Sequence, residues 1–136
     1  MRERSFTSEK SDLAISKFSK AAGRLGEAIN APESPIRSDA ILQRFEFTFE
    51  LAWKALRVYL AENEGIVVSS PKGVLKAAFK QGLIETVSES GFLKMLEDRN
   101  TSTHVYDESE ANEISVRVRD SHLSALQSLL ARLQRP

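Results

Sequence analysis

Hydrophobic residues recur at helical spacing along most of this chain. In the first part they follow one another every three or four positions, as Phe18, Ala22, Leu25 and Ile29. This spacing places the four side chains on one face of an α-helix. Ser8 or Ser11 is suited to begin the helix, because a serine hydroxyl accepts a hydrogen bond from a free amide of the first turn. The pattern predicts a helix to about Asn30, followed by a loop over residues 31–38, where two prolines interrupt it.

The stretch RFEFTFELAWKALRVYL, residues 44–60, allows two interpretations. Its phenylalanines at positions 45, 47 and 49 alternate with polar residues, which is typical of a β-strand. However, the apolar character continues well beyond the usual length of a strand, and Glu, Leu, Ala and Lys favour a helix. A helix would align five apolar residues in one stripe, namely Ile41, Phe45, Phe49, Ala52 and Leu56. Phe47, Leu51 and Val58 would lie beside it. We therefore expect a central, largely buried helix from Ser38 or Asp39 to about Asn63.

Clear start and stop signals divide the rest of the chain. Gly65 is suited to end the second helix, and Ser70 followed by Pro71 is a typical beginning for a short third helix. Gly82 is expected to end this helix, which carries Val74, Leu75, Ala78 and Phe79 on its inner face. Ser88 or Ser90 can begin a fourth helix, whose apolar residues are Phe92, Leu93, Met95 and Leu96.

A last helix is expected from about Asp107, with Glu110 as the partner in a capping box. Its apolar positions are Ile114, Val118, Leu123, Leu126, Leu129, Leu130 and Leu133. No convincing strand remains. The sequence therefore predicts an all-α fold, an antiparallel up-and-down bundle of four long helices plus a short helix, in a single domain of residues 1–136.

Composition narrows the function classes. The 136 residues include nineteen Lys or Arg and nineteen Asp or Glu, so the formal net charge is zero. This argues against a surface uniformly coated in positive charge for nucleic acid, although it is compatible with a local basic pocket. The absence of cysteine excludes disulfide and thiolate chemistry and favours a cytoplasmic location. No apolar run approaches membrane-spanning length, and the N-terminal MRERSFTSEKSD lacks the apolar stretch of a signal peptide.

A polar cluster interrupts the apolar stripe of the fourth helix. In LEDRNTSTHVYDE, residues 96–108, the stripe of Phe92, Leu93 and Leu96 is followed by Arg99, Asn100, Thr103 and His104. If the helix continued, Asn100 and His104 would share a face. A buried arginine needs a partner or a wet cleft. Ordinary structural roles stay open, because Arg99 could pair with Glu97, Asp98 or Glu46, and His104 could stabilise the end of the helix.

RNTSTHVY, residues 99–106, resembles the R-x4-H motif of HEPN proteins in its extended form R-x4-H-x-Y. The stretches RFEFTFELAWKALRVYL, SSPKGVLKAAFKQGLI and LEDRNTSTHVYDE are similar to successive signature blocks of one subgroup, the nucleotidyltransferase substrate-binding proteins. The chain thus resembles the HepT-like HEPN family over roughly residues 10–133. R-x4-H alone is a weak signal, but three blocks in order on an all-helical chain make a specific one.

The resemblance implies a toxin–antitoxin partnership with a minimal nucleotidyltransferase. It also implies a metal-independent endoribonuclease, with an RNA substrate, that works as a homodimer or higher oligomer with two motifs in a shared cleft. In this scheme Arg99 stabilises the phosphate, Asn100 orients its neighbours and His104 moves protons. Imidazole titrates near neutral pH and guanidinium binds phosphate oxygens in a planar fork, so both residue types suit this chemistry. Tyr106 would receive AMP from the transferase, which would silence the nuclease.

No cofactor is implied, and no metal site is expected, because His104 and His122 are far apart in the sequence and no His-Glu-x-x-His pattern occurs. Several other residues have plain structural interpretations. We expect Trp53 in the core, Lys54 in solvent, Glu46 and Glu50 near Arg99 or surface lysines, and His122 as a satisfied core or interface residue. We also expect Tyr106 to be either the modified residue or a half-buried aromatic residue.

Two other functions remain compatible with the sequence. In one, the protein is a non-catalytic subunit that binds a nucleotide or another substrate for a two-component nucleotidyltransferase. In the other, it is a helical interaction module without a chemical site. The first alternative shares the fold and the partner with the ribonuclease hypothesis, and differs only in whether Arg99 and His104 cleave RNA.

Overall fold

The computed structural model describes residues 9–104 and 107–135, which form an all-α bundle without a strand. Its α-helices are α1 (Glu9–Asn30), α2 (Arg37–Tyr59), α3 (Pro71–Lys80), α4 (Glu89–Ser102), α5 (Glu108–Arg117) and α6 (Leu123–Gln134). A π-helical turn, Leu60–Glu64, extends α2, and a second one, Val118–His122, joins α5 to α6. A 3-10 turn, Thr86–Ser88, precedes α4.

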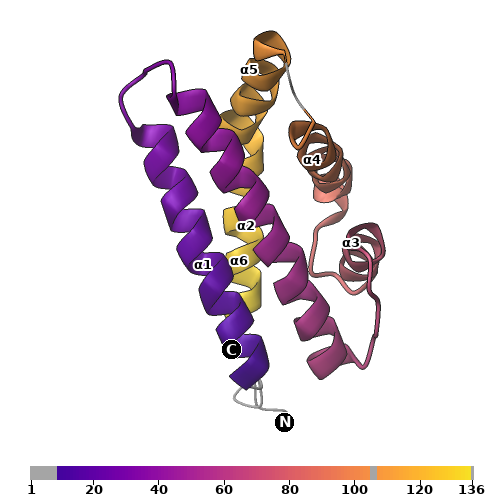
Figure 1. Cartoon of the computed structure of the whole chain (residues 1–136). Coiled ribbons are helices and arrows are strands. Elements are labelled where there is room, and N and C mark those ends of the chain that lie inside the picture. The colour runs from indigo at the N-terminus through magenta and orange to yellow at the C-terminus, as the bar shows by residue number, and fades with distance from the viewer. Residues whose placement is uncertain (1–8, 105–106, 136) are drawn as a thin grey trace.

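The long segments run alternately up and down the bundle (Figure 1). α1 and α2 form an antiparallel pair joined by the loop at one end of the molecule, and α5 and α6 together make one long rod. α4 lies on the other side of α2, with the short α3 beside it. The predicted bundle of four long helices plus a short one is therefore confirmed.

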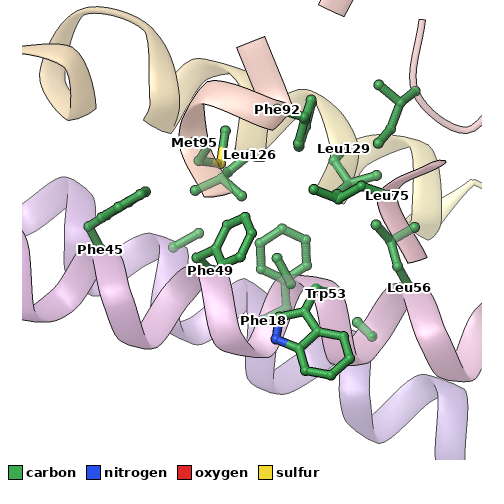
Figure 2. Close-up of a cluster of buried hydrophobic side chains, with 14 of the residues drawn as sticks. Phe18, Phe45, Phe49, Trp53, Leu56, Leu75, Phe92, Met95, Leu126 and Leu129 are labelled. Atoms are coloured by element: carbon green, nitrogen blue, oxygen red, sulfur yellow. The ribbon is translucent and has the colours of Figure 1, made fainter. Parts of the chain in front are cut away.

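The second helix is central, as its broad apolar surface predicted. α2 contacts every other α-helix of the described chain, and the stripe expected from its sequence is buried throughout. Figure 2 shows side chains of α1, α2, α3, α4 and α6 meeting in one cluster, with Phe18 and Phe49 near its middle. Burial of this apolar surface is the main force that holds the helices together. Phe47, which was expected beside the stripe, is 61% exposed.

Most of the expected helix ends are found where the sequence places them. Gly65 and Gly82 adopt positive φ angles of 68° and 78°, a conformation that glycine reaches without strain. The Ser70 hydroxyl accepts a hydrogen bond from the Gly73 amide at 3.0 Å, and Pro71 is the first residue of α3. Asp107 caps α5 through the amide of Ser109 at 2.9 Å.

Ser11, one of the two residues suited to begin the first helix, lies inside α1, which begins at Glu9. Two further details of the expected helix starts differ. α2 begins at Arg37, one or two residues before the predicted Ser38 or Asp39, so both of those residues lie within its first turn. At α5, the Asp107 carboxylate bonds the second amide of the helix, whereas a capping box would have used the amide of Glu110. Neither difference changes which residues face the core.

The inner face of α4 was predicted incorrectly in part. Its buried residues are Phe92, Met95 and Asp98, spaced three apart, whereas Leu93 and Leu96 are only half-buried. The helix also ends at Ser102, and the His104 amide donates to the Thr101 carbonyl in a turn at 2.9 Å. Asn100 and His104 therefore do not share a helical face. The buried face includes an acidic residue, Asp98, because its carboxylate is hydrogen-bonded by Arg117 and His122.

Within residues 9–104 and 107–135, no helix combines the length and the apolar character needed to cross a bilayer.

Candidate functional site

The predicted site residues lie at the C-terminal end of α4. Arg99 is in the last turn of the helix, and its side chain is 24% exposed. Asn100 is exposed beside it, and His104 is exposed in the turn that follows the helix. Tyr106 lies outside the described residues. The structure therefore gathers Arg99, Asn100 and His104 at one end of one helix, with Arg99 nearest to the core.

Arg99 is held in place by α2. Its Nη2 donates to Glu50 Oε1, its Nη1 donates to Asn100 Oδ1 at 3.1 Å, and its guanidinium carbon lies 5.9 Å from the centroid of the Phe49 ring. Glu50 also forms an ion pair with Lys54 at 3.3 Å. Among the expected partners of Arg99, the contact with Glu50 is thus confirmed. The planar guanidinium has several donors, so it can hold a carboxylate and still face an outside ligand.

Glu50 is ionised in this arrangement. Burial raises the pKa of Glu50, but the nearby indole N–H of Trp53 and the charges of Arg99 and Lys54 outweigh that effect and hold the pKa below its ordinary value of 4.5. The Arg99–Glu50 contact is therefore a true ion pair near neutral pH. Because both side chains are partly exposed, solvent screens the pair and an incoming anion can compete for Arg99.

Arg99 faces a groove formed by α1, α2 and the end of α4, which we call the arginine groove. Its volume is 690 Å³, and it is lined by Ala21, Arg24, Gln43, Arg44, Glu46, Phe47, Glu50, Arg99 and Thr103. Three arginines face two glutamates here. Glu46 accepts a hydrogen bond from the Ser102 hydroxyl at 2.7 Å, and Arg44 donates to the Arg24 carbonyl at 2.7 Å.

The groove combines positive charge with an exposed aromatic ring. Arg24 and Arg44 reach it from α1 and α2, and Phe47 is on its wall. Guanidinium groups bind phosphate oxygens, and an exposed aromatic ring can stack on a base. Sequence reasoning did not single out Arg24 or Arg44, because neither lies near the motif along the chain. His104 is not among the lining residues; it follows Thr103, which is.

A second polar cluster lies inside the bundle, one residue before Arg99. The Asp98 carboxylate, only 3% exposed, accepts two hydrogen bonds from Arg117, at 2.8 Å from Nε and 2.9 Å from Nη2. His122 Nε2 lies 2.8 Å from the same carboxylate. The sequence hypothesis for His122, a satisfied core residue, is confirmed. The position of Asp98 was missed, although its spacing from Phe92 and Met95 was a usable signal.

Both acid–base groups of this cluster are shifted. Burial raises the pKa of Asp98, but hydrogen bonds from Arg117 and His122 outweigh it, so the pKa is lower than the ordinary 3.8. Burial lowers the pKa of His122 below 6.5 despite the neighbouring carboxylate. His122 is consequently neutral at pH 7, and its Nε2 carries the hydrogen, because an ionised carboxylate can only accept.

The fold and the groove together define a small helical protein whose charged site suits an anionic ligand. The chain belongs to the family described as nucleotidyltransferase substrate binding protein like, whose model matches residues 13–135. This confirms the family level of the resemblance seen in the sequence. The family description associates its members with nucleotidyltransferases and with substrate binding.

A crystal structure of a protein from Thermus thermophilus is similar to this chain. The two are 39% identical in sequence and superimpose with a TM-score of 0.81, over 87% of this chain and 99% of the other. No curated protein matches the chain.

Proposed function

We propose that this protein is a HepT-like HEPN ribonuclease, the toxin that pairs with a minimal nucleotidyltransferase. The observation that carries the proposal is the position of Arg99, the first residue of the R-x4-H-x-Y motif. Arg99 is anchored on α2 through Glu50 and faces a groove with two further arginines. A phosphodiester backbone is the ligand class that such a groove recognises through its charge.

In the proposed reaction, the 2′-hydroxyl of RNA attacks the adjacent phosphorus. The 5′-oxygen of the next nucleotide leaves, so that a 2′,3′-cyclic phosphate and a free 5′-hydroxyl are formed. His104 moves the proton of the attacking or leaving oxygen, and Arg99 stabilises the charge that develops on the phosphate. An exposed imidazole at a helix end is accessible to a substrate, and a phosphate can compete with Glu50 for the partly exposed Arg99.

The complete site is proposed to form in a homodimer. One chain supplies a single Arg99 and a single His104, and His104 lies outside the lining of the arginine groove. A two-fold axis beside the end of α4 would place the two motifs face to face and would concentrate positive charge on one RNA strand. Overall neutrality would then be no obstacle to RNA binding, since the charge is local. A monomer in sedimentation experiments at micromolar concentration would contradict this arrangement.

Control is proposed to act through Tyr106. Transfer of AMP from ATP to its hydroxyl by the partner nucleotidyltransferase would release pyrophosphate and add a phosphodiester two residues from His104. That negative charge would compete with RNA for Arg99. With the partner, ATP and magnesium, the intact mass should rise by one AMP group, and Tyr106→Phe should stay unmodified and toxic. Modification at another residue would contradict this role.

The family description supports a second candidate, a non-catalytic subunit that presents a nucleotide or another substrate to the transferase. The arginine groove fits this role as well, because its charges suit any phosphate-bearing ligand. The two candidates differ first in whether the protein alone cleaves RNA, and modification and toxicity follow only from the ribonuclease.

The decisive experiment is RNA cleavage by purified protein in the presence of a metal chelator. The wild type should cleave single-stranded RNA, His104→Ala and Arg99→Ala should not, and Lys72→Ala, which removes an exposed charge on α3, should cleave normally. Circular dichroism should show that all four proteins are folded. Cleavage that requires added metal would contradict the mechanism, and no cleavage by the wild type would favour the substrate-binding subunit.

A further inference from the structure

The residue before Arg99 has a different environment from the motif itself. Asp98 is buried, and its carboxylate is bound by the guanidinium fork of Arg117 and by His122. Lys94, one turn earlier on α4, lies 3.8 Å from it. Arg117 ends α5, and His122 is the last residue of the π-helical turn. One carboxylate on α4 is therefore joined to two positions on the neighbouring rod.

The cluster also reaches α2. The ring of Phe45 stacks on the His122 imidazole, with 5.5 Å between the ring centroids and 20° between the planes. His122 itself is buried, so it cannot touch a ligand in the groove. A π-helical turn changes the direction in which the following residues of a helix point, and such turns are frequent near functional sites. Here the turn ends at the residue that binds Asp98.

Another side of the last turn of α4 is held by α2. Arg99 binds Glu50, and the Ser102 hydroxyl donates to Glu46. Consecutive residues of an α-helix point about 100° apart. Asp98 and Arg99 therefore hold the same turn from two directions, one toward α5 and one toward α2.

From this geometry we propose that Asp98 is a positioning residue, which orients the last turn of α4 so that Arg99 faces the arginine groove and the chain leaves the helix toward His104. The assignment of Arg99 and His104 to RNA cleavage rests on the proposed function; the positioning itself does not.

The hydrogen bonds of Asp98 suit a residue that fixes the orientation of α4, and not only one that fills space in the core. An apolar residue at position 98 could fill the same space, but it would allow the helix to rotate and slide against α5. A carboxylate held by a planar fork accepts its two hydrogen bonds only in one narrow geometry. Buried charged groups often add little net stability, and fixing one arrangement among several is the role for which they are best supported.

The test compares Asp98→Asn with Glu97→Gln, a neutralised carboxylate at the neighbouring, exposed position of α4 that pairs with Lys94. Cleavage kinetics would be measured well below the unfolding temperature of each variant. Because a misplacement of about 1 Å can cost about 100-fold in rate, kcat of Asp98→Asn should fall by about 10-fold to 100-fold, with KM within about twofold of wild type. Glu97→Gln should change neither constant by more than about twofold.

Crystal structures of the same variants give a readout that does not depend on activity. In Asp98→Asn the Arg99–Glu50 and Ser102–Glu46 contacts should be lost or rearranged, and in Glu97→Gln they should persist. If the wild type cleaves no RNA, the proposed function fails, and these contacts still decide the positioning role. Unchanged contacts in a folded Asp98→Asn protein would overturn it, as would wild-type kcat.

Should Asp98→Asn fail to fold, Arg117→Lys provides the second variant. It keeps the positive charge but loses the fork, so the carboxylate keeps an ion pair without its fixed geometry. We expect a folded protein with kcat reduced by about fivefold to tenfold and displaced Arg99 contacts. Wild-type kcat and contacts in this variant would equally overturn the proposal.

Discussion

Asp98 and Arg99 are neighbours in the chain, and both are ion-paired, but their surroundings are opposite. The Asp98 side chain is 3% exposed and has a bidentate partner, whereas the Arg99 side chain is 24% exposed and its partner Glu50 is 31% exposed. In the inner pair, Asp98–Arg117, the carboxylate is shielded from competing ions although Arg117 is 35% exposed, whereas in the outer pair, Arg99–Glu50, both side chains are open to them. The difference separates a pair that fixes structure from a pair that can exchange its partner for a ligand.

The free energies of unfolding of Asp98→Ala and Arg99→Ala should show this difference most strongly. Asp98→Ala leaves Arg117 and His122 without their common acceptor. We expect it to lower the free energy of unfolding by about 3 kcal/mol, the lower end for a broken buried pair because Arg117 reaches solvent. Arg99→Ala should lower it by less than about 1 kcal/mol, since exposed pairs contribute little. Urea denaturation monitored by circular dichroism measures both, and equal losses would remove the distinction.

The dependence of stability on pH should come from the inner cluster. The folded-state pKa of His122 is lowered, and Asp98, Lys94 and Arg117 are the charged groups that face it. Below pH 6.5, the ordinary pKa of histidine, His122 becomes protonated in the unfolded chain but stays neutral in the folded chain. The contribution of His122 to the free energy of unfolding is therefore fully present above pH 6.5 and is lost as pH decreases. We expect stability to fall between pH 7 and pH 5.5, by at most about 1 kcal/mol.

The variant His122→Gln places an amide N–H near the position of His122 Nε2, so it keeps a donor for Asp98 but removes the titration. Its unfolding free energy should therefore stay nearly constant over this range. A second loss is expected in both proteins at more acid pH, below the ordinary Asp98 pKa of 3.8, because the folded-state pKa of that carboxyl is also lowered. An equal slope between pH 7 and pH 5.5 in wild type and His122→Gln would show that another group dominates.

Removal of the Glu50 carboxylate from the Arg99–Glu50 pair should change the affinity for RNA. In a His104→Ala background, which prevents cleavage, Glu50→Gln frees Arg99 and removes a negative charge from the groove. We expect twofold to fivefold tighter binding of a short single-stranded RNA, or up to about 1 kcal/mol, in fluorescence anisotropy at low salt. Glu97→Gln is the control away from the groove. Weaker binding in Glu50→Gln would mean that Glu50 is needed to hold Arg99 in its binding position.

Much of the fold could be predicted from the sequence because its signals are local. Helical spacing identified the apolar stripe of α2, and glycine, serine and proline marked the ends of the helices. The motif also drew attention to the end of α4, and Glu50 was among the acids expected near Arg99. The catalytic roles of Arg99, Asn100 and His104 and the modification of Tyr106 remain predictions.

The inner cluster could not be predicted in the same way. Asp98 stands between Glu97 and Arg99, where a run of charges is typical of a solvated face. Its partners Arg117 and His122 are 19 and 24 residues away, so the pairing depends on how α4 packs against the α5–α6 rod. The arginine groove is similarly a product of packing, because Arg24, Arg44 and Arg99 come from three helices.

If Arg99 exchanges Glu50 for a phosphate while Arg117 stays with Asp98, the two guanidinium groups should respond differently to RNA. The most direct measurement is a nuclear magnetic resonance titration of ¹⁵N-labelled His104→Ala protein with a short single-stranded RNA, following the arginine Nε–H signals. Arg99→Lys and Arg117→Lys variants would assign the two signals. Exchange at Arg99 predicts that its signal shifts with saturation and that the Arg117 signal does not move. An unchanged Arg99 signal in a protein that binds the RNA would contradict it.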